Sequence, residues 1–295
     1  MSAPDFDVFD CHHHVGDVRS FMPHTGDTSE PLRHEHPDAQ QATRGQDAPT
    51  EGEALTAERS ARVRIMDAGG VHQAAVIPGH AYPRTNGLAD TVGLNDRIAA
   101  YRDAQPDRFP VAIGVVEPIF EEACLPELDR CARELGLVGI SFHARFQGVS
   151  MDSPWVTRYV ERVAELGMVP VLHAMTESSD EALWKTAEVA RAFPDVTMLV
   201  LDAFSSFEGT REAFAIAERC PNLLWDTSLS YNFDFLEAFA GEFGAERVVF
   251  GTDLYSPPLG RRISHVVPQI LESGLSDADK ALVLGGNARR LFGLA

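Results

Sequence analysis

The stretch FDCHHHVGD, residues Phe9–Asp17, carries the strongest structural signal in this chain. An apolar strand runs directly into three consecutive histidines, and residues two apart on a strand point to the same side. His12 and His14 are therefore expected to face one way together, while His13 points elsewhere. Paired imidazoles at this spacing suit a divalent metal ion, with Zn²⁺ as the first expectation and Mn²⁺ or Fe²⁺ as alternatives. A solvated histidine cluster is the competing interpretation.

Short runs rich in Val and Ile alternate with longer amphipathic segments along the rest of the chain. This alternation is typical of βα units that feed a parallel sheet, and eight strands is the number found in a (β/α)₈ barrel. The sequence therefore predicts one α/β domain over residues 1–295, a TIM barrel that is either regular or distorted. The predicted strands are residues 7–11, 73–77, 109–116, 138–142, 169–172, 197–201, 223–226 and 248–250. The predicted helices are residues 89–104, 121–135, 155–166, 180–192, 210–219, 233–243 and 277–294.

One segment, from Val18 to about Thr56, is crowded with His, Pro, Gly, Asp and Gln and lacks both helical and strand periodicity. It is predicted to be a long loop after the first strand. Loops of this kind in a barrel lie on the face that carries the active site, so this loop is expected to cover the pocket.

Composition limits the classes of partner. The formal charge of −19 would repel phosphate backbones and anionic membrane surfaces, so neither nucleic acid nor a membrane is an expected partner. Four widely spaced cysteines with no CxxC pair argue against a disulfide framework and a thiolate zinc cluster. The N-terminal residues lack the pattern of a signal peptide, and a cytoplasmic location is expected. A homo-oligomer stays open.

Two further strand ends carry metal-binding side chains. In VPVLHAM, His173 ends an apolar strand, and in VVFGTDLYSP, Asp253 follows a Val-rich strand. Side chains at the carboxyl ends of barrel strands are placed for chemistry. Each residue also has a structural interpretation, because His173 can be a hydrogen-bonded core histidine and Asp253 can cap a turn. Together with the first motif, they predict a metal site formed by His12, His14, His173 and Asp253.

Other side chains are expected around the same mouth. His80 and Tyr82 in IPGHAYPR and Arg145 in GISFHARFQG are candidate substrate-binding residues, and Arg145 is the natural partner of a substrate carboxylate. His143, two residues before Arg145, is a candidate catalytic residue. A surface salt bridge is the alternative for Arg145. Trp225 is expected to fill the core rather than line the pocket.

The order of these motifs resembles the amidohydrolase-2 branch of the amidohydrolase superfamily, which is related to aminocarboxymuconate semialdehyde decarboxylase. The resemblance spans nearly the whole chain and implies a TIM barrel with a divalent metal ion. It matches the family's opening Asp-x-His-x-His, its strand-five histidine, its strand-eight Gly-Thr-Asp and its C-terminal ending. In this chain these are Asp10, His12 and His14; His173; Gly251, Thr252 and Asp253; and Asn287, Ala288, Arg289 and Arg290.

Strand six departs from this pattern. Family members commonly carry a histidine at its end, where this chain has Asp202 in MLVLDAFSS. A carboxylate donates a proton at neutral pH only if its pKa is raised, so Asp202 is either a catalytic residue or a group that orients a neighbouring histidine.

Three functions remain open. The leading hypothesis is hydrolysis of an amide, lactone or related carbonyl of a small molecule by a metal-activated water, with Asp253 taking the proton. The alternative is non-oxidative decarboxylation or hydration of an unsaturated or aromatic carboxylic acid, with Arg145 holding the carboxylate. The absence of the strand-six histidine favours hydrolysis over decarboxylation or hydration. A metal-free or non-catalytic ligand-binding barrel is the third.

Overall fold

The computed structural model describes residues 6–17, 51–80, 86–230, 232–256, 258 and 265–294. Its sheet contains nine parallel strands in the order β8-β7-β6-β5-β4-β3-β2-β1-β9. The strands are β1 (Phe9–Asp17), β2 (Gln73–Pro78), β3 (Val111–Val115), β4 (Gly139–Phe142), β5 (Val169–His173), β6 (Met198–Leu201), β7 (Leu223–Asp226), β8 (Val248–Val249) and β9 (Leu254–Ser256).

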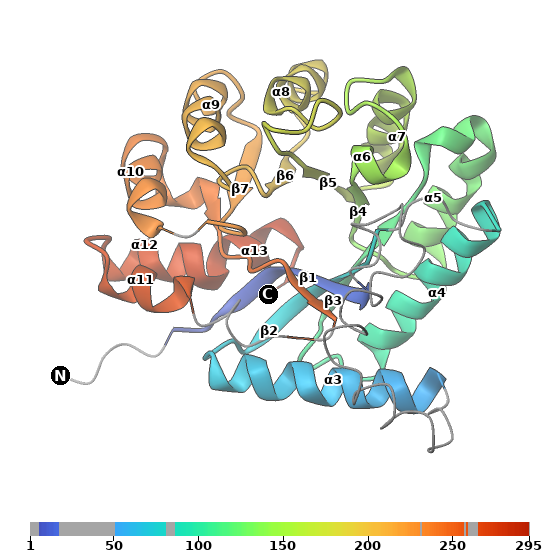
Figure 1. Cartoon of the computed structure of the whole chain (residues 1–295), viewed down its shortest axis with the longest axis horizontal. Coiled ribbons are helices and arrows are strands. Elements are labelled where there is room, and N and C mark those ends of the chain that lie inside the picture. The colour runs from blue at the N-terminus through green and yellow to red at the C-terminus, as the bar shows by residue number, and fades with distance from the viewer. Residues whose placement is uncertain are drawn as a thin grey trace, which may run out of the picture.

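Helices connect successive strands and lie around the outside of the sheet, as Figure 1 shows. This arrangement confirms the predicted (β/α)₈ fold in its distorted form. The helices before β6 are α3 (Glu51–Ala68), α4 (Leu88–Asp103), η2 (Pro118–Cys124), α5 (Leu125–Arg133), α6 (Ala144–Gln147), α7 (Pro154–Glu165) and α8 (Leu183–Ala192). The later ones are α9 (Phe207–Ala217), α10 (Phe233–Phe243), η3 (Ala245–Arg247), α11 (Val266–Glu272), α12 (Asp277–Ala281), η5 (Leu282–Gly286) and α13 (Asn287–Leu291).

The two ends of the barrel sequence meet at β1. Cys11 N donates a hydrogen bond to Phe250 O, directly after β8, at 2.9 Å. One step further along, His13 of β1 pairs in register with Leu254 of β9. The residues between β8 and β9 therefore lie beside the histidines of β1.

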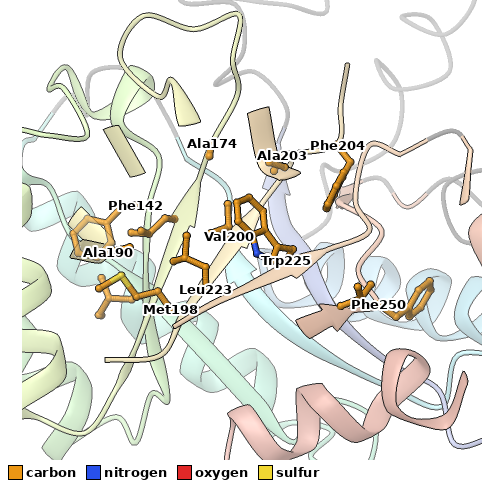
Figure 2. Packing of buried hydrophobic residues seen from close by; sticks show 14 of the residues in the cluster. Phe142, Ala174, Ala190, Met198, Val200, Ala203, Phe204, Leu223, Trp225 and Phe250 are labelled. Carbon is orange, nitrogen blue, oxygen red and sulfur yellow. The ribbon is translucent and has the colours of Figure 1, made fainter. Parts of the chain in front are cut away.

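Apolar side chains pack on both sides of the strands. Between strands and helices, Trp225 of β7 is fully buried, and its ring lies 6.1 Å from that of Phe204 and 5.8 Å from that of Phe239. Figure 2 shows Trp225 among other buried side chains, which agrees with its predicted core position. Inside the barrel, a second cluster includes Phe9 and Val249. Within the described residues, no helix combines the length and apolar character needed to cross a bilayer.

The predicted boundaries were wrong near the N-terminus. Strand β1 does not end at Cys11 but continues through the histidines to Asp17, because this part of the strand pairs with β2 on one side and β9 on the other. The predicted loop from Val18 to about Thr56 overlaps α3, which begins at Glu51. The first ten residues of α3, EGEALTAERS, contain only one large apolar side chain, Leu55, so they lack the apolar periodicity that marks a helix. Residues 18–50 of that predicted loop lie outside the described residues.

Candidate metal centre

Three histidines converge at the carboxyl ends of β1 and β5. His12, His14 and His173 are completely buried. The Nε2 atoms of His12 and His14 are 3.0 Å apart, and those of His14 and His173 are 3.2 Å apart. His12 and His14 thus share one side of β1, as the alternation of a strand requires. His13 turns instead to Asp10, with its Nε2 2.9 Å from Oδ2 of that carboxylate.

Backbone carbonyls fix the tautomers of two of these rings. His14 Nδ1 lies 3.2 Å from Pro78 O, and His173 Nδ1 lies 3.1 Å from Phe142 O. A carbonyl oxygen only accepts, so each Nδ1 must donate the proton. In the neutral ring, each Nε2 then presents a lone pair toward the same point. Closely spaced lone pairs repel one another unless a cation lies between them, so this donor set fits a metal ion.

A carboxylate completes the set. Asp253 Oδ1 is 3.4 Å from His12 Nε2 and 3.6 Å from His14 Nε2. Asp253 adopts a positive φ of 55°, a conformation unfavourable for a side chain with a Cβ, which is characteristic of functional sites. Three imidazoles and one carboxylate form a ligand set suited to Zn²⁺, Mn²⁺ or Fe²⁺.

The pKa values of the rings agree with this donor set. Burial lowers the pKa of His14 and of His173 well below the usual value, so both rings are neutral and able to bind a metal. Burial also opposes protonation of His12, but the hydrogen bond to Asp226 and the charges of Asp253, Asp202 and Asp226 together raise its pKa to about 9. A cation near His12 would therefore be favoured by the same carboxylates that favour a proton there.

Two buried carboxylates hold the backbone and ring of His12. Asp226 Oδ2 lies 2.9 Å from His12 Nδ1, as expected of a carboxylate that orients a metal-binding imidazole. Asp10 Oδ1 accepts hydrogen bonds from the backbone N of His12 at 3.0 Å and of Thr252 at 3.1 Å. Asp10 therefore links the metal-binding strand to the segment that contains Asp253.

Asp202 lies at the end of β6, beside this cluster. His12, Asp202 and Asp253 form a second buried group, each offering one ligand atom, and these atoms lie within 4.8 Å of one another. Ser228 Oγ donates to Asp202 Oδ1 at 2.9 Å, and Asp202 N donates to Asp226 Oδ1 at 3.0 Å. Burial raises the pKa of Asp202 to about 6.

A second group of side chains adjoins His173. The ring of His143 lies flat on that of His173, with centroids 4.1 Å apart and an interplanar angle of 9°. Its Nδ1 makes a short hydrogen bond with Oε1 of Glu181, which precedes α8. Arg145 Nε is 3.3 Å from Glu181 Oε2. Arg145 lies in the short helix α6, which begins directly after His143.

His80 also lies in this group. Its Nε2 is 3.0 Å from Ser141 Oγ, and its ring centroid is 5.3 Å from that of His173 and 5.1 Å from that of His143. The predicted substrate residues His80 and Arg145 therefore lie near the candidate ligands, whereas Tyr82 lies outside the described residues. Sequence reasoning missed Glu181 and Ser141, because nothing in the pattern around them distinguishes them from ordinary polar residues.

Comparison with known proteins identifies relatives of this chain. The chain is 25% identical over 241 residues to 2-amino-3-carboxymuconate-6-semialdehyde decarboxylase from Dictyostelium discoideum. This region is 68% of the chain and spans 66% of the length of that relative.

Solved structures share the fold at lower identity. The 5-carboxyvanillate decarboxylase of Sphingomonas paucimobilis matches with a TM-score of 0.68 and 17% identity, over 98% of this chain and all of that one (100%). The 4-oxalomesaconate hydratase of Rhodopseudomonas palustris matches with a TM-score of 0.68 and 15% identity, over 97% of this chain and 95% of that one. A dihydroxybenzoic acid decarboxylase from Polaromonas sp. JS666, with bound manganese, matches with a TM-score of 0.67 and 18% identity, over 98% of this chain and 97% of that one.

A family model for amidohydrolases matches residues 9–294, from the first residue of β1 to three residues after α13. The match includes the histidines of β1, His173, Asp253 and the C-terminal Asn287–Arg290 segment whose order carried the resemblance. The chain therefore belongs to the metal-dependent amidohydrolase family.

Proposed function

We propose that this chain is a metal-dependent lyase that removes CO₂ from a small unsaturated or aromatic carboxylic acid. The observation that carries the proposal is the convergence of the Nε2 atoms of three imidazoles and the Asp253 carboxylate at the barrel mouth. The relatives named above are decarboxylases and a hydratase, which favours this reaction over the hydrolysis that the sequence first suggested.

His12, His14, His173 and Asp253 would hold the ion. When bound, the metal would supply a positive charge that attracts the substrate carboxylate and stabilises negative charge formed during the reaction. We assign Arg145 to orienting the carboxylate, because its side chain is 26% exposed and its guanidinium is held by Glu181 beside the site.

Decarboxylation requires a proton at the carbon that bears the carboxylate. Once that proton has been added, the carbon–carboxylate bond breaks, its electron pair restores the double bond or ring, and CO₂ leaves without consuming water. We assign the proton transfer to His143. Glu181 contacts its Nδ1 and fixes the orientation of the ring, and stacking on His173 holds the ring next to the proposed metal ligands.

The test is a turnover assay of the Mn²⁺-loaded and Zn²⁺-loaded protein in D₂O and in H₂¹⁸O. Substrates would be ¹³C-carboxyl-labelled 2,6-dihydroxybenzoate, 5-carboxyvanillate and 2-amino-3-carboxymuconate semialdehyde, with a panel of lactones and amides beside them. Decarboxylation gives ¹³CO₂ and one deuterium at the vacated carbon. Incorporation of ¹⁸O without CO₂ would instead indicate hydration or hydrolysis.

The matched control is His14→Ala, which should lose both metal and turnover because an incomplete ligand set holds the ion weakly. Metal content by elemental analysis and fold by circular dichroism separate these effects. A loaded protein that binds these acids but turns over none of the panel would support the non-catalytic alternative.

A further inference from the structure

Two overlapping groups of metal-binding side chains meet at His12. The first is His12, His14 and His173, and the second is His12, Asp202 and Asp253, with every member buried. The second group contains a carboxylate, Asp202, that the metal centre described above does not use.

The two groups cannot represent two separate ions bound through His12. Its Nδ1 lies 2.9 Å from Asp226 Oδ2, so only Nε2 remains for a metal. That Nε2 is the atom 3.0 Å from His14 Nε2 and 3.4 Å from Asp253 Oδ1. One imidazole nitrogen has one lone pair and binds one ion. The two groups therefore surround the same point.

Asp202 is held in place by contacts that orient its carboxylate. Its φ of 68° is left-handed, which a residue with a Cβ adopts only when its surroundings impose it. Here Asp226 Oδ1 accepts from the backbone N of Asp202, while Ser228 Oγ donates to Oδ1. Asp226 thus fixes both the His12 ring and the Asp202 backbone with its two oxygens.

We propose that Asp202 is a fifth ligand of this metal ion, so that three imidazoles and two carboxylates bind it. This proposal rests on the metal centre of the proposed function. Metal–ligand bonds of about 2.1–2.2 Å put opposite ligands about 4.2–4.4 Å apart. The ligand atoms of His12, Asp202 and Asp253 lie within 4.8 Å of one another, which is close to this span.

The added carboxylate predicts a metal preference. Two carboxylates balance the double charge of the ion. Carboxylate oxygens suit Mn²⁺, whereas Zn²⁺ is already bound well by four tetrahedral ligands, so a fifth ligand should matter more for Mn²⁺. Removing Asp202 should therefore weaken Mn²⁺ binding more than Zn²⁺ binding.

The experiment measures metal dissociation constants directly and needs no substrate. Metal-free wild type, Asp202→Asn and Asp202→Ala would be titrated with Mn²⁺, with free Mn²⁺ followed by electron paramagnetic resonance and Zn²⁺ measured by competition. For Asp202→Ala, we expect Mn²⁺ affinity to fall by about tenfold or more and Zn²⁺ affinity by about threefold or less. Asp202→Asn, which keeps an oxygen and can still accept from Ser228, should lie between wild type and Asp202→Ala.

The matched control is Glu117→Gln, which removes another buried carboxylate, just after β3, that belongs to neither group. It should leave both affinities unchanged. Unchanged Mn²⁺ affinity in the Asp202 variants, or an equal loss in Glu117→Gln, would overturn the fifth-ligand assignment while leaving the four-ligand centre intact. A wild type that binds no metal would overturn the centre as well. If circular dichroism shows that Asp202→Ala is unfolded, the Asn variant alone decides the question.

Discussion

Glu181 is a carboxyl group in unusual surroundings. Its side chain is fully buried, and it contacts both His143 and Arg145. Burial raises the pKa of Glu181 to about 8, even though Arg145 favours its charged form. The folded protein therefore holds a proton on this group in a pH range where the unfolded chain has released it.

This raised pKa predicts how stability depends on pH. The contribution of Glu181 is fully present below its unfolded pKa of about 4.3 and is lost as the pH rises through about 8. Relative to Glu181→Gln, the metal-free wild type should thus lose a few kcal/mol of unfolding free energy between about pH 5 and pH 8. Urea unfolding of both proteins at several pH values measures this, and parallel curves would contradict the prediction.

Gly251 lies where the metal-binding segments approach most closely. A Cβ there would be 2.7 Å from Asp226 Oδ2, 3.0 Å from Cys11 Sγ and 3.1 Å from His12 Cβ. Since Asp226 is fixed by its own hydrogen bonds, Gly251→Ala should displace the His12 ring, cost about 1–3 kcal/mol of stability and weaken metal binding. Gly241→Ala in α10, which has no neighbour within 4 Å of its Cβ position, is the control and should be neutral or slightly stabilising.

The sequence could predict site residues that are placed by their near neighbours in the chain, but not those placed by distant residues. The alternation of His12 and His14 is a local property of a strand, so the sequence was sufficient to predict their shared direction. Glu181 is different, because it reaches His143 across 38 positions from a loop without periodicity. The direction of Asp202 depends on a left-handed backbone that Asp226 and Ser228 impose from the next strand.

At the level of elements, helix α3 is tied to the metal-binding strands by Arg62. Its buried guanidinium donates to His14 O at 2.8 Å, to Leu254 O at 3.1 Å and to Ser256 Oγ at 3.0 Å. Glu58, one turn earlier, accepts from the same guanidinium at 2.7 Å. These bonds hold β1 against β9, and β9 begins immediately after Asp253.

Arg62→Met should therefore affect both stability and metal binding. The substitution keeps a long apolar stem but removes the donor to two buried carbonyls and the positive charge beside Glu58, at a cost of about 3–5 kcal/mol. Metal affinity should fall by about tenfold, because His14 and Asp253 are no longer held together. Arg158→Met removes an exposed ion pair with Glu161 and should change stability by less than about 1 kcal/mol. Equal effects of the two substitutions in thermal and metal titrations would argue against this role.

The sequence predicted elements with a regular apolar pattern best. Helix α10, at Phe233–Phe243, has the predicted bounds. Helix α3, whose first residues were assigned to a loop, was not predicted, and neither were β9 and α11. Buried hydrogen bonds from Arg62 tie α3 to β1 and β9, and periodicity does not reveal such contacts. Strand β9 is only three residues long and is defined by its pairing with β1.

For the whole molecule, the prediction of a single domain can be tested by unfolding. Because β1 pairs with both β2 and β9, the first strand cannot detach without opening the barrel at both neighbours. The metal-free protein should then show one transition, with tryptophan fluorescence and far-ultraviolet circular dichroism coinciding. Added Mn²⁺ or Zn²⁺ should shift that transition to higher temperature. Two separated transitions would indicate more than one folding unit.

The position of β1 between β2 and β9 also has a consequence for biosynthesis. His12 and His14 leave the ribosome first among the proposed ligands, whereas Asp253 is the last of them to be synthesised. Until then, the histidines of β1 have neither the Asp226 carboxylate nor the Phe250 carbonyl that holds this strand in the folded protein. A nascent chain that has not yet reached Asp253 lacks one of the four proposed ligands, so loading of the complete site must follow translation of Asp253.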